Sequence, residues 1–421
     1  MMRRTKGWSM SLLLSMLLTC AAQGQEWTRF RGPHGQGISD ARTIPVKWTQ
    51  QDYNWKMKLP AGGHGSPVIW KDKVFVTCED PEPAGGILLA LDVSDGRVLW
   101  RKQYKLTPYR FHNDNSYATT TPVVDADRVY VLWQTSHETI LAALDHNGDE
   151  LWRRTFPGVY SQFGPGTSPM LYDDIVVFTF EHWQKSEQHE SAWLALDRKT
   201  GQTRWILKRE SRQESYSTPC DYLPEGGEPQ LIFTSEAHGI TAVNPATGSV
   251  VWEVQSALPA RVVSSPVIAG DMLIGTCGKG AAGIQLAAVR APLAVEPQQA
   301  KLVYTCTGKS APYVPTSLAK DGLLFTFHDQ GDVSCLRVDT GQVLWCEKPG
   351  GRFYGSPVWV NGLLYCINRA GEVPVIRAAP KYELLAINSL GEKSQATPAV
   401  AGGRMYLRTY SHLISVGGGK E

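Results

Sequence analysis

Short apolar runs separated by polar turns recur along the whole chain. One of them, LLALDVSDGRVLW, spans Leu88 to Trp100, and its pattern returns as LAALDHNGDELW, WLALDRKTGQTRW, ITAVNPATGSVVW and VSCLRVDTGQVLW. Every copy has an apolar run, an acid or amide, a polar turn and a closing Trp. Such runs, bounded by turn residues, predict paired β-strands. The tryptophans of the five copies are Trp100, Trp152, Trp205, Trp252 and Trp345.

A second marker precedes each copy: a hydroxyl residue, usually followed by Pro, and then an apolar pair. Its spacing of 40 to 55 residues is typical of stacked supersecondary units. Because proline cannot donate to a strand ladder, it suits the first position of a strand. The eight hydroxyl residues are Ser66, Thr121, Ser168, Thr218, Ser265, Thr316, Ser356 and Thr397.

The two markers together predict four strands in each unit, and eight such units predict an all-β, eight-bladed β-propeller with four-stranded antiparallel blades. Gly96 and Gly201 lie in the turn before the Trp strand, where a positive φ would favour glycine. A blade cannot bury both faces alone, so we expect each indole to fill the gap to the neighbouring blade.

The two ends of the chain are predicted to complete one blade together. The eighth unit, TPAVAGGRMYLRTYSHLISV, lacks a Trp strand, whereas YNWKMKL supplies Trp55 before the first marker. We therefore expect Tyr53–Leu59 to close the last blade, which removes open sheet edges. Residues 55–421 then form the propeller and residues 25–54 an N-terminal extension. In the seventh unit, LLAINSLGEKSQ, Lys393 stands near the Trp position.

The first 24 residues have the pattern of a secretory signal. Arg3, Arg4 and Lys6 precede the apolar run WSMSLLLSMLLTCAA, which is too short to span a membrane. We expect export to the periplasm or the extracellular space. Lipid attachment at Cys20, which would anchor the protein to the outer membrane, is the alternative to simple cleavage. No other apolar run could cross a bilayer.

The charge of the chain bears on its partners. The formal net charge is +2, and removal of the signal, which carries three basic residues and no acidic one, leaves a value near −1. A near-neutral surface without a basic stripe argues against nucleic-acid binding. We expect a monomer.

The units SPVIWKDKVFV and LLALDVSDGRVLW resemble the repeat of pyrroloquinoline quinone (PQQ) enzymes over about residues 55–416, and the segment Trp27–Ser39 resembles the lead-in of exported members. The resemblance implies two branches: PQQ-dependent alcohol and sugar dehydrogenases, and the non-enzymatic BamB-like branch that assists outer-membrane barrel assembly. Many dehydrogenases carry adjacent cysteines and a calcium cluster. This sequence has no Cys-Cys pair, and no calcium cluster can be assigned to its residues. No cofactor is therefore expected, and PQQ with Ca²⁺ remains the alternative.

Candidate binding residues come from the loops that enter each first strand, because these loops should converge on one mouth of the central channel. Aromatic and charged residues there would meet a protein segment or a small anionic or sugar ligand, or would only hydrate the channel. The polar loop HNDNS, His112–Ser116, is a further candidate. The channel-mouth residues are Tyr117, Glu214, Arg261 and Arg352, four positions before a marker, and His64, Tyr216, Tyr354 and Gln395, two positions before one.

No catalytic or metal motif can be assigned. HExxH and G-x-S-x-G are absent, and the calcium-like spacing of Asp145, Asn147 and Asp149 falls on a repeat turn. The sequence therefore favours an exported, non-catalytic propeller for binding or assembly. The alternatives are a PQQ-dependent oxidoreductase with an atypical site and a carbohydrate-binding or hydrolytic propeller.

Overall fold

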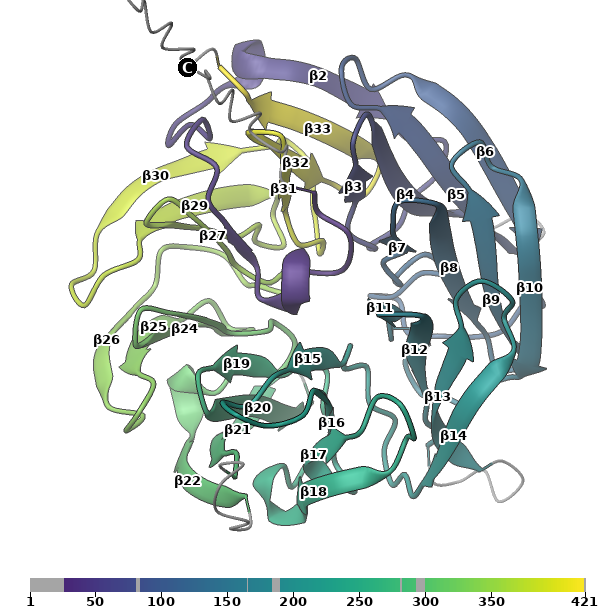
Figure 1. Ribbon diagram of the computed structural model, residues 1–421. Helices are drawn as coiled ribbons and strands as arrows, with labels where there is room; N and C mark the ends of the chain where they lie inside the picture. Colours follow the sequence, from purple (N-terminus) through teal and green to yellow (C-terminus); the bar gives the residue numbers. More distant parts are fainter. Residues whose placement is uncertain are drawn as a thin grey trace, which may run out of the picture.

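The chain folds into a ring of eight β-sheets around a central axis (Figure 1). The computed structural model describes residues 26–80, 84–164, 166–183, 190–280, 282–292 and 300–419. The predicted signal, residues 1–24, and Cys20 lie outside the described residues. The predicted eight-bladed propeller is confirmed. Within the described ranges, no helix is long and apolar enough to span a membrane.

We number the blades 1 to 8 along the chain, and each begins at the channel with its shortest strand (Figure 1). The strands of blades 1 to 4 are β3 (Val68–Trp70), β4 (Lys73–Asp80), β5 (Gly85–Asp92) and β6 (Val98–Lys105); β7 (Val123–Val124), β8 (Arg128–Gln134), β9 (Glu138–Asp145) and β10 (Glu150–Pro157); β11 (Met170–Tyr172), β12 (Ile175–Phe180), β13 (Ser191–Asp197) and β14 (Thr203–Arg209); β15 (Cys220–Tyr222), β16 (Gln230–Ser235), β17 (Gly239–Val243) and β18 (Val250–Val254).

Blades 5 to 8 repeat this order, and within the described ranges four single-turn 3₁₀ helices lie between elements. The strands are β19 (Val267–Ala269), β20 (Met272–Lys279), β21 (Ala282–Arg290) and β22 (Lys301–Cys306); β23 (Leu318–Lys320), β24 (Leu323–Phe327), β25 (Val333–Arg337) and β26 (Val343–Glu347); β27 (Val358–Val360), β28 (Leu363–Tyr365), β29 (Glu372–Arg377) and β30 (Leu384–Ser389); β31 (Ala399–Ala401), β32 (Arg404–Arg408) and β33 (His412–Gly417). The helices are η1 (Pro33–Gly35), η2 (Gln50–Asp52), η3 (Gln255–Ala257) and η4 (Gly308–Ser310).

The ring is closed by a strand from the front of the chain. β2 (Tyr53–Lys58) pairs antiparallel with β33, and Trp55 lies opposite Ser415. This pairing completes blade 8 with four strands, as the sequence predicts. A second N-terminal strand, β1 (Ile38–Ser39), pairs in parallel with β27 and gives blade 7 a fifth strand.

The hydrophobic core lies between the blades. One cluster, for example, joins Phe75 and Leu88 of blade 1 to Val131 and Ile140 of blade 2, and similar clusters join each later pair up to blades 6 and 7. The largest cluster unites blades 7, 8 and 1 with Trp27 and Trp48 of the N-terminal segment. The segment is thus part of the core.

The docking tryptophans bridge neighbouring blades in one repeated geometry. The indole N–H of each donates to a carbonyl just after the third strand of the next blade, at 2.9–3.0 Å, and Tyr304 takes the same role through its hydroxyl at 2.8 Å. Trp252 differs, because its indole donates to Gln230 in its own blade at 3.0 Å. The tryptophans that follow the repeated geometry are Trp55, Trp100, Trp152, Trp205 and Trp345.

In blade 7, the order of the strands differs from the sequence interpretation. The run LLAINS forms the outer strand β30, whereas the sequence pattern placed it third, and Ala386 lies opposite Val375 in the register that a docking Trp occupies elsewhere. Lys393 lies in the loop beyond this strand, away from the Trp position. The true third strand, EVPVIR, contains Pro374, so LLAIN was the better match to the repeat.

Candidate functional site

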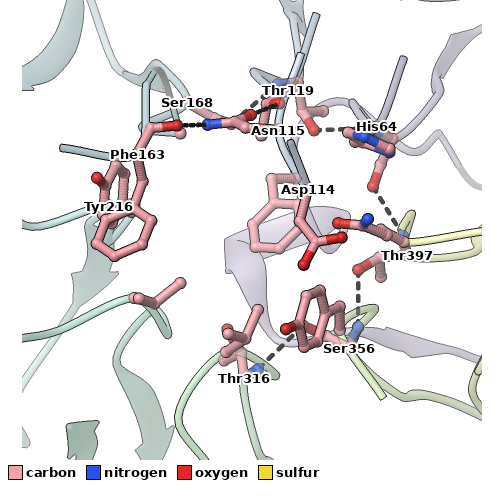
Figure 2. Close-up of a pocket in the computed structure, with 18 of the residues that line it drawn as sticks. His64, Asp114, Asn115, Thr119, Phe163, Ser168, Tyr216, Thr316, Ser356 and Thr397 are labelled. Carbon is pink, nitrogen blue, oxygen red and sulfur yellow. Dashed lines mark hydrogen bonds between the residues drawn. The ribbon is translucent and has the colours of Figure 1, made fainter. Parts of the chain in front are cut away.

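The eight marker hydroxyls surround the channel and are linked to one another. In seven steps, a backbone N–H of one marker residue donates to the hydroxyl of the marker residue in the next blade, at 2.9–3.1 Å. Figure 2 shows part of this ring, including the bonds that join Thr316, Ser356 and Thr397. Each hydroxyl that accepts such a bond keeps its own proton to donate, and accepting one bond strengthens the next. We call these eight residues the hydroxyl ring.

The N-terminal segment closes one end of the channel, and it crosses the centre of the ring as the purple trace in Figure 1. Phe30 lines the floor of the cavity above it. Arg31 is 1% exposed and donates to the carbonyls of Ser317 and Gln36 at 2.8 and 2.9 Å. The segment's contacts reach every blade, at Ile69, Val124, Met170, Pro219, Ile268, Ser317, Trp359 and Gly403.

The other end of the channel opens as a funnel with a cavity of about 400 Å³. Its walls combine the hydroxyl ring, except Ser265, with aromatic side chains, and Figure 2 shows Phe163 and Tyr216 side by side on one wall. Cavities of this size take small ligands or a short protein segment. The aromatic members are Phe30, Phe163, Tyr216, Tyr313 and Tyr354.

Four of the eight sequence-predicted channel-mouth residues line this cavity: His64, Tyr216, Tyr354 and Gln395. All four stand two positions before a marker hydroxyl. Extended chain places residues i and i+2 on the same side, so these side chains face the axis together with the hydroxyl ring.

The four residues that stand two positions further back do not line the cavity. Glu214 and Arg261 pair with each other at 3.6 Å, with side chains 2% and 6% exposed, and the Arg261 guanidinium also lies 4.6 Å from the centre of the Phe163 ring. Tyr117 packs edge-on against Phe111, and Arg352 is exposed to solvent. At these positions the side chains are turned to other contacts, so this half of the set does not join the other four residues in the cavity lining.

The HNDNS loop reaches into the cavity from the connection between β6 and β7. His112, Asp114 and Asn115 all line it. Asn115 donates to the Phe163 carbonyl at 2.8 Å, and Asp114 forms an ion pair with Arg369 at 2.6 Å. The pair joins two segments that are 255 positions apart in the sequence.

The environment of His64 affects its protonation. Its Nδ1 is buried without a hydrogen-bond partner, and its ring lies 5.6 Å from that of Tyr410. Burial, followed by the charges of Arg408 and Lys393, lowers the pKa of His64 to about 4, so the imidazole is neutral at neutral pH. Arg408 and Lys393 thus place positive charge close to the imidazole, in addition to the effect of burial.

Sequence reasoning missed several residues of this site. The hydroxyl ring had a visible signal, since all eight markers begin with Ser or Thr. Phe30, Phe163 and Tyr313 had none, because they come from loops of unequal length outside the repeat. Arg369 was also missed, since only the folded ring brings it to Asp114.

The residues of the cavity do not fit a calcium-bound quinone. Among the described residues that line it, Asp114 is the one acidic side chain, and its carboxylate already pairs with Arg369. Calcium takes six to eight oxygen ligands, usually with several carboxylates. Over the ranges that the structure describes, no three His, Cys, Asp or Glu side chains gather as metal ligands do.

A comparison with protein families matches the model described as outer membrane protein assembly factor BamB, over residues 36–207 and 194–292. Among curated proteins, no match to the sequence was found.

Solved structures show the same fold at low identity. BamB from Moraxella catarrhalis matches with a TM-score of 0.60 and 15% identity, over 86% of this chain and 95% of that one. A europium-containing methanol dehydrogenase matches with a TM-score of 0.67 and 12% identity, over 91% and 89%. Quinohemoprotein alcohol dehydrogenase from Comamonas testosteroni matches with a TM-score of 0.64 and 12% identity, over 94% and 81%.

Proposed function

This chain belongs to the family of the outer membrane protein assembly factor BamB, and from that premise we propose that it is an exported, non-catalytic propeller that serves binding or assembly. One observation carries the proposal: the funnel is closed at one end, and the polar lining among its described residues consists mainly of hydroxyls, with Asp114 as the one carboxylate, already paired. Such a surface can hold a ligand or a protein segment, whereas it offers no paired acid and base for chemistry.

Export to the periplasm or the extracellular space belongs to the same proposal. The signal pattern of residues 1–24 supports it, with attachment to the outer membrane through Cys20 as the lipid-anchored form. Mass spectrometry of the mature N-terminus tests this point. A chain that begins near residue 25 indicates a cleaved soluble protein, and a diacylglyceryl-modified Cys20 indicates the anchored form.

The second candidate is a PQQ-dependent oxidoreductase with an atypical site. The volume of the cavity, about 400 Å³, and its aromatic walls favour a flat ligand, although the acidic ligands for calcium do not fit. The third, a carbohydrate-binding or hydrolytic propeller, would use the same aromatic and hydroxyl lining.

The test has two arms on the purified mature chain. In the first, PQQ and Ca²⁺ are added, and dye reduction is followed with alcohols and aldoses; we expect no turnover, and turnover would overturn the non-catalytic proposal. In the second, the chain is expressed in a bacterium that lacks its own BamB. Restored levels of folded outer-membrane barrels support assembly, and unchanged levels contradict the assembly role.

A further inference from the structure

An ion pair between Asp114 and Arg369 joins two loops at the mouth of the funnel. Asp114 comes from the loop between blades 1 and 2, and Arg369 comes from the β28–β29 connection of blade 7, with 2.6 Å between the carboxylate and the guanidinium. Their side chains are 41% and 30% exposed. Because solvent reaches both partners, the pair contributes little to stability and can be exchanged at low cost.

Arg369 is held in place without help from Asp114. Its guanidinium lies over the ring of Tyr354, 4.3 Å from the centroid, and its backbone N–H donates to the Arg352 carbonyl at 2.7 Å. A planar guanidinium fixed by stacking is preorganised to bind a carboxylate through two parallel hydrogen bonds. Asp114 lines the cavity, and its carboxylate contacts the guanidinium of Arg369, which is not itself a lining residue. In Figure 2 the Asp114 carboxylate projects into the open space of the funnel.

The charges around the cavity favour a negative group at this place. Arg408 is 0% exposed, and its guanidinium bonds to the Gly65 carbonyl at 2.5 Å and to the Cys78 sulfur at 4.0 Å. Its positive charge is therefore not neutralised by a carboxylate at hydrogen-bond distance. After burial, which is the largest cause of the lowered pKa of His64, Arg408, Lys393 and Arg369 lower this pKa further, and Asp114 raises it. An enclosed site with excess positive charge attracts anions.

The hydroxyl ring also favours a ligand that carries hydrogen-bond acceptors, as a carboxylate does. Each ring hydroxyl that accepts a backbone N–H retains a proton that it can donate to a ligand. A ligand rich in acceptors satisfies these donors.

We propose that Asp114 occupies a carboxylate-binding site, and that the funnel binds carboxylate-bearing ligands which replace Asp114 on Arg369 while their apolar or sugar bodies lie against the aromatic walls. This inference rests on the proposed binding function and names its ligand class. The carboxylate can belong to a peptide C-terminus or to a sugar acid, and the two sources share the same chemistry at Arg369.

The experiment compares Asp114→Ala, Arg369→Gln and the control Glu383→Ala by isothermal titration calorimetry. Glu383 is a matched control because it forms an exposed ion pair with Arg377 at 2.5 Å in the outer hairpin of blade 7. The probes are hippurate and its uncharged amide for the peptide-like source, and galacturonate and galactose for the sugar source. Circular dichroism and thermal melts establish that each variant is folded.

Asp114→Ala should bind at least one of the two acids about tenfold more tightly than the wild type. The reason is that the ligand carboxylate no longer has to displace Asp114 from one charge-assisted interaction with Arg369. Affinity for the amide and for galactose should not change, and Arg369→Gln should lose the acids. Glu383→Ala should behave as the wild type. The acid that gains more identifies the source.

Two results would overturn the inference. In the first, Asp114→Ala has the same affinity as the wild type for both acids. In the second, its affinity rises equally for the acids and for their uncharged counterparts. Binding of the uncharged probes in either case would leave the proposed binding function intact. Conversely, turnover by the wild type would contradict the non-catalytic proposal. It would leave the inference about Asp114 standing if Asp114→Ala still bound the acids, and not their uncharged counterparts, more tightly.

Discussion

Trp48 stacks on Tyr365, with ring centroids 6.4 Å apart and an interplanar angle of 23°. Tyr365 occupies, in blade 7, the second-strand position that contacts the docking Trp in other blades, as Phe75 contacts Trp100 and Tyr406 contacts Trp55. The docking position of blade 7 itself holds Ala386. The N-terminal segment therefore supplies from outside the repeat the indole that blade 7 lacks.

The first prediction tests this substitution. Trp48→Ala should lower the free energy of unfolding by about 3–5 kcal/mol, the usual cost of emptying a buried Trp site. Ala386→Trp should destabilise the wild type, because two indoles would compete for one gap. In the Trp48→Ala background, the same change should instead recover part of the loss. Urea unfolding of the four proteins measures this, and equal destabilisation by Ala386→Trp in both backgrounds would contradict it.

The second prediction concerns the glycine against which a docking Trp packs. Gly96 has φ +76°, and a Cβ there would come within 2.6 Å of the Trp55 ring. Gly96→Ala should therefore cost backbone strain of about 1–2 kcal/mol and a further 1–3 kcal/mol or so of overpacking.

Gly270 separates these two costs. Its φ is +65°, and a Cβ there would meet no atom within 4 Å. Gly270→Ala should show the backbone strain alone, so its melting temperature should fall less than that of Gly96→Ala. Equal losses would mean that the Trp55 contact adds nothing.

The architecture could be predicted because it follows from features that repeat. The Trp, the turn glycine and the marker hydroxyl recur in register, and each solves the same packing problem at every interface between blades. The closure by Tyr53–Lys58 was also predictable, since the last unit lacks one strand. Blade 7 was misread because its third strand carries Pro374 and its turn lacks glycine.

The site was predictable only where it uses the repeat. His64 and Tyr354 stand at a fixed offset from a marker, and the extended backbone carries that offset into the channel. Glu214 and Arg261 were misplaced because an irregular loop has no such period, and the two charges neutralise each other away from the axis. The Asp114–Arg369 pair depends on loop lengths in distant blades, which no local pattern encodes.

The third prediction concerns the hydroxyl ring. The Thr397 hydroxyl accepts the backbone N–H of Ser356 at 2.9 Å, and both residues are 2% exposed. Thr397→Val keeps the shape but leaves that N–H unpaired, so the free energy of unfolding should fall by about 1–3 kcal/mol.

Thr397→Ser is the matched control for this change. It retains the hydroxyl, so it should keep the hydrogen bond and lose less stability than Thr397→Val. Hydrogen exchange at the Ser356 amide gives a local readout: protection should fall in the Val variant and persist in the Ser variant. Unchanged protection in the Val variant would show that the hydroxyl does not hold this amide.

The fourth prediction follows from the buried imidazole. The pKa of His64 is about 4 in the folded protein and should be near the ordinary value of about 6.5 when unfolded. Between these values the unfolded state binds the proton, so His64 lowers stability as the pH falls through this window. His64→Gln should remove that loss, at up to about 1.4 kcal/mol per pH unit.

Urea unfolding at intervals from pH 7 to pH 4 measures the difference in free energy of unfolding between variant and wild type. Because other groups titrate in both proteins, this difference isolates His64. A difference for His64→Gln that does not change with pH would mean that the imidazole is hydrated in the funnel and not held neutral by burial.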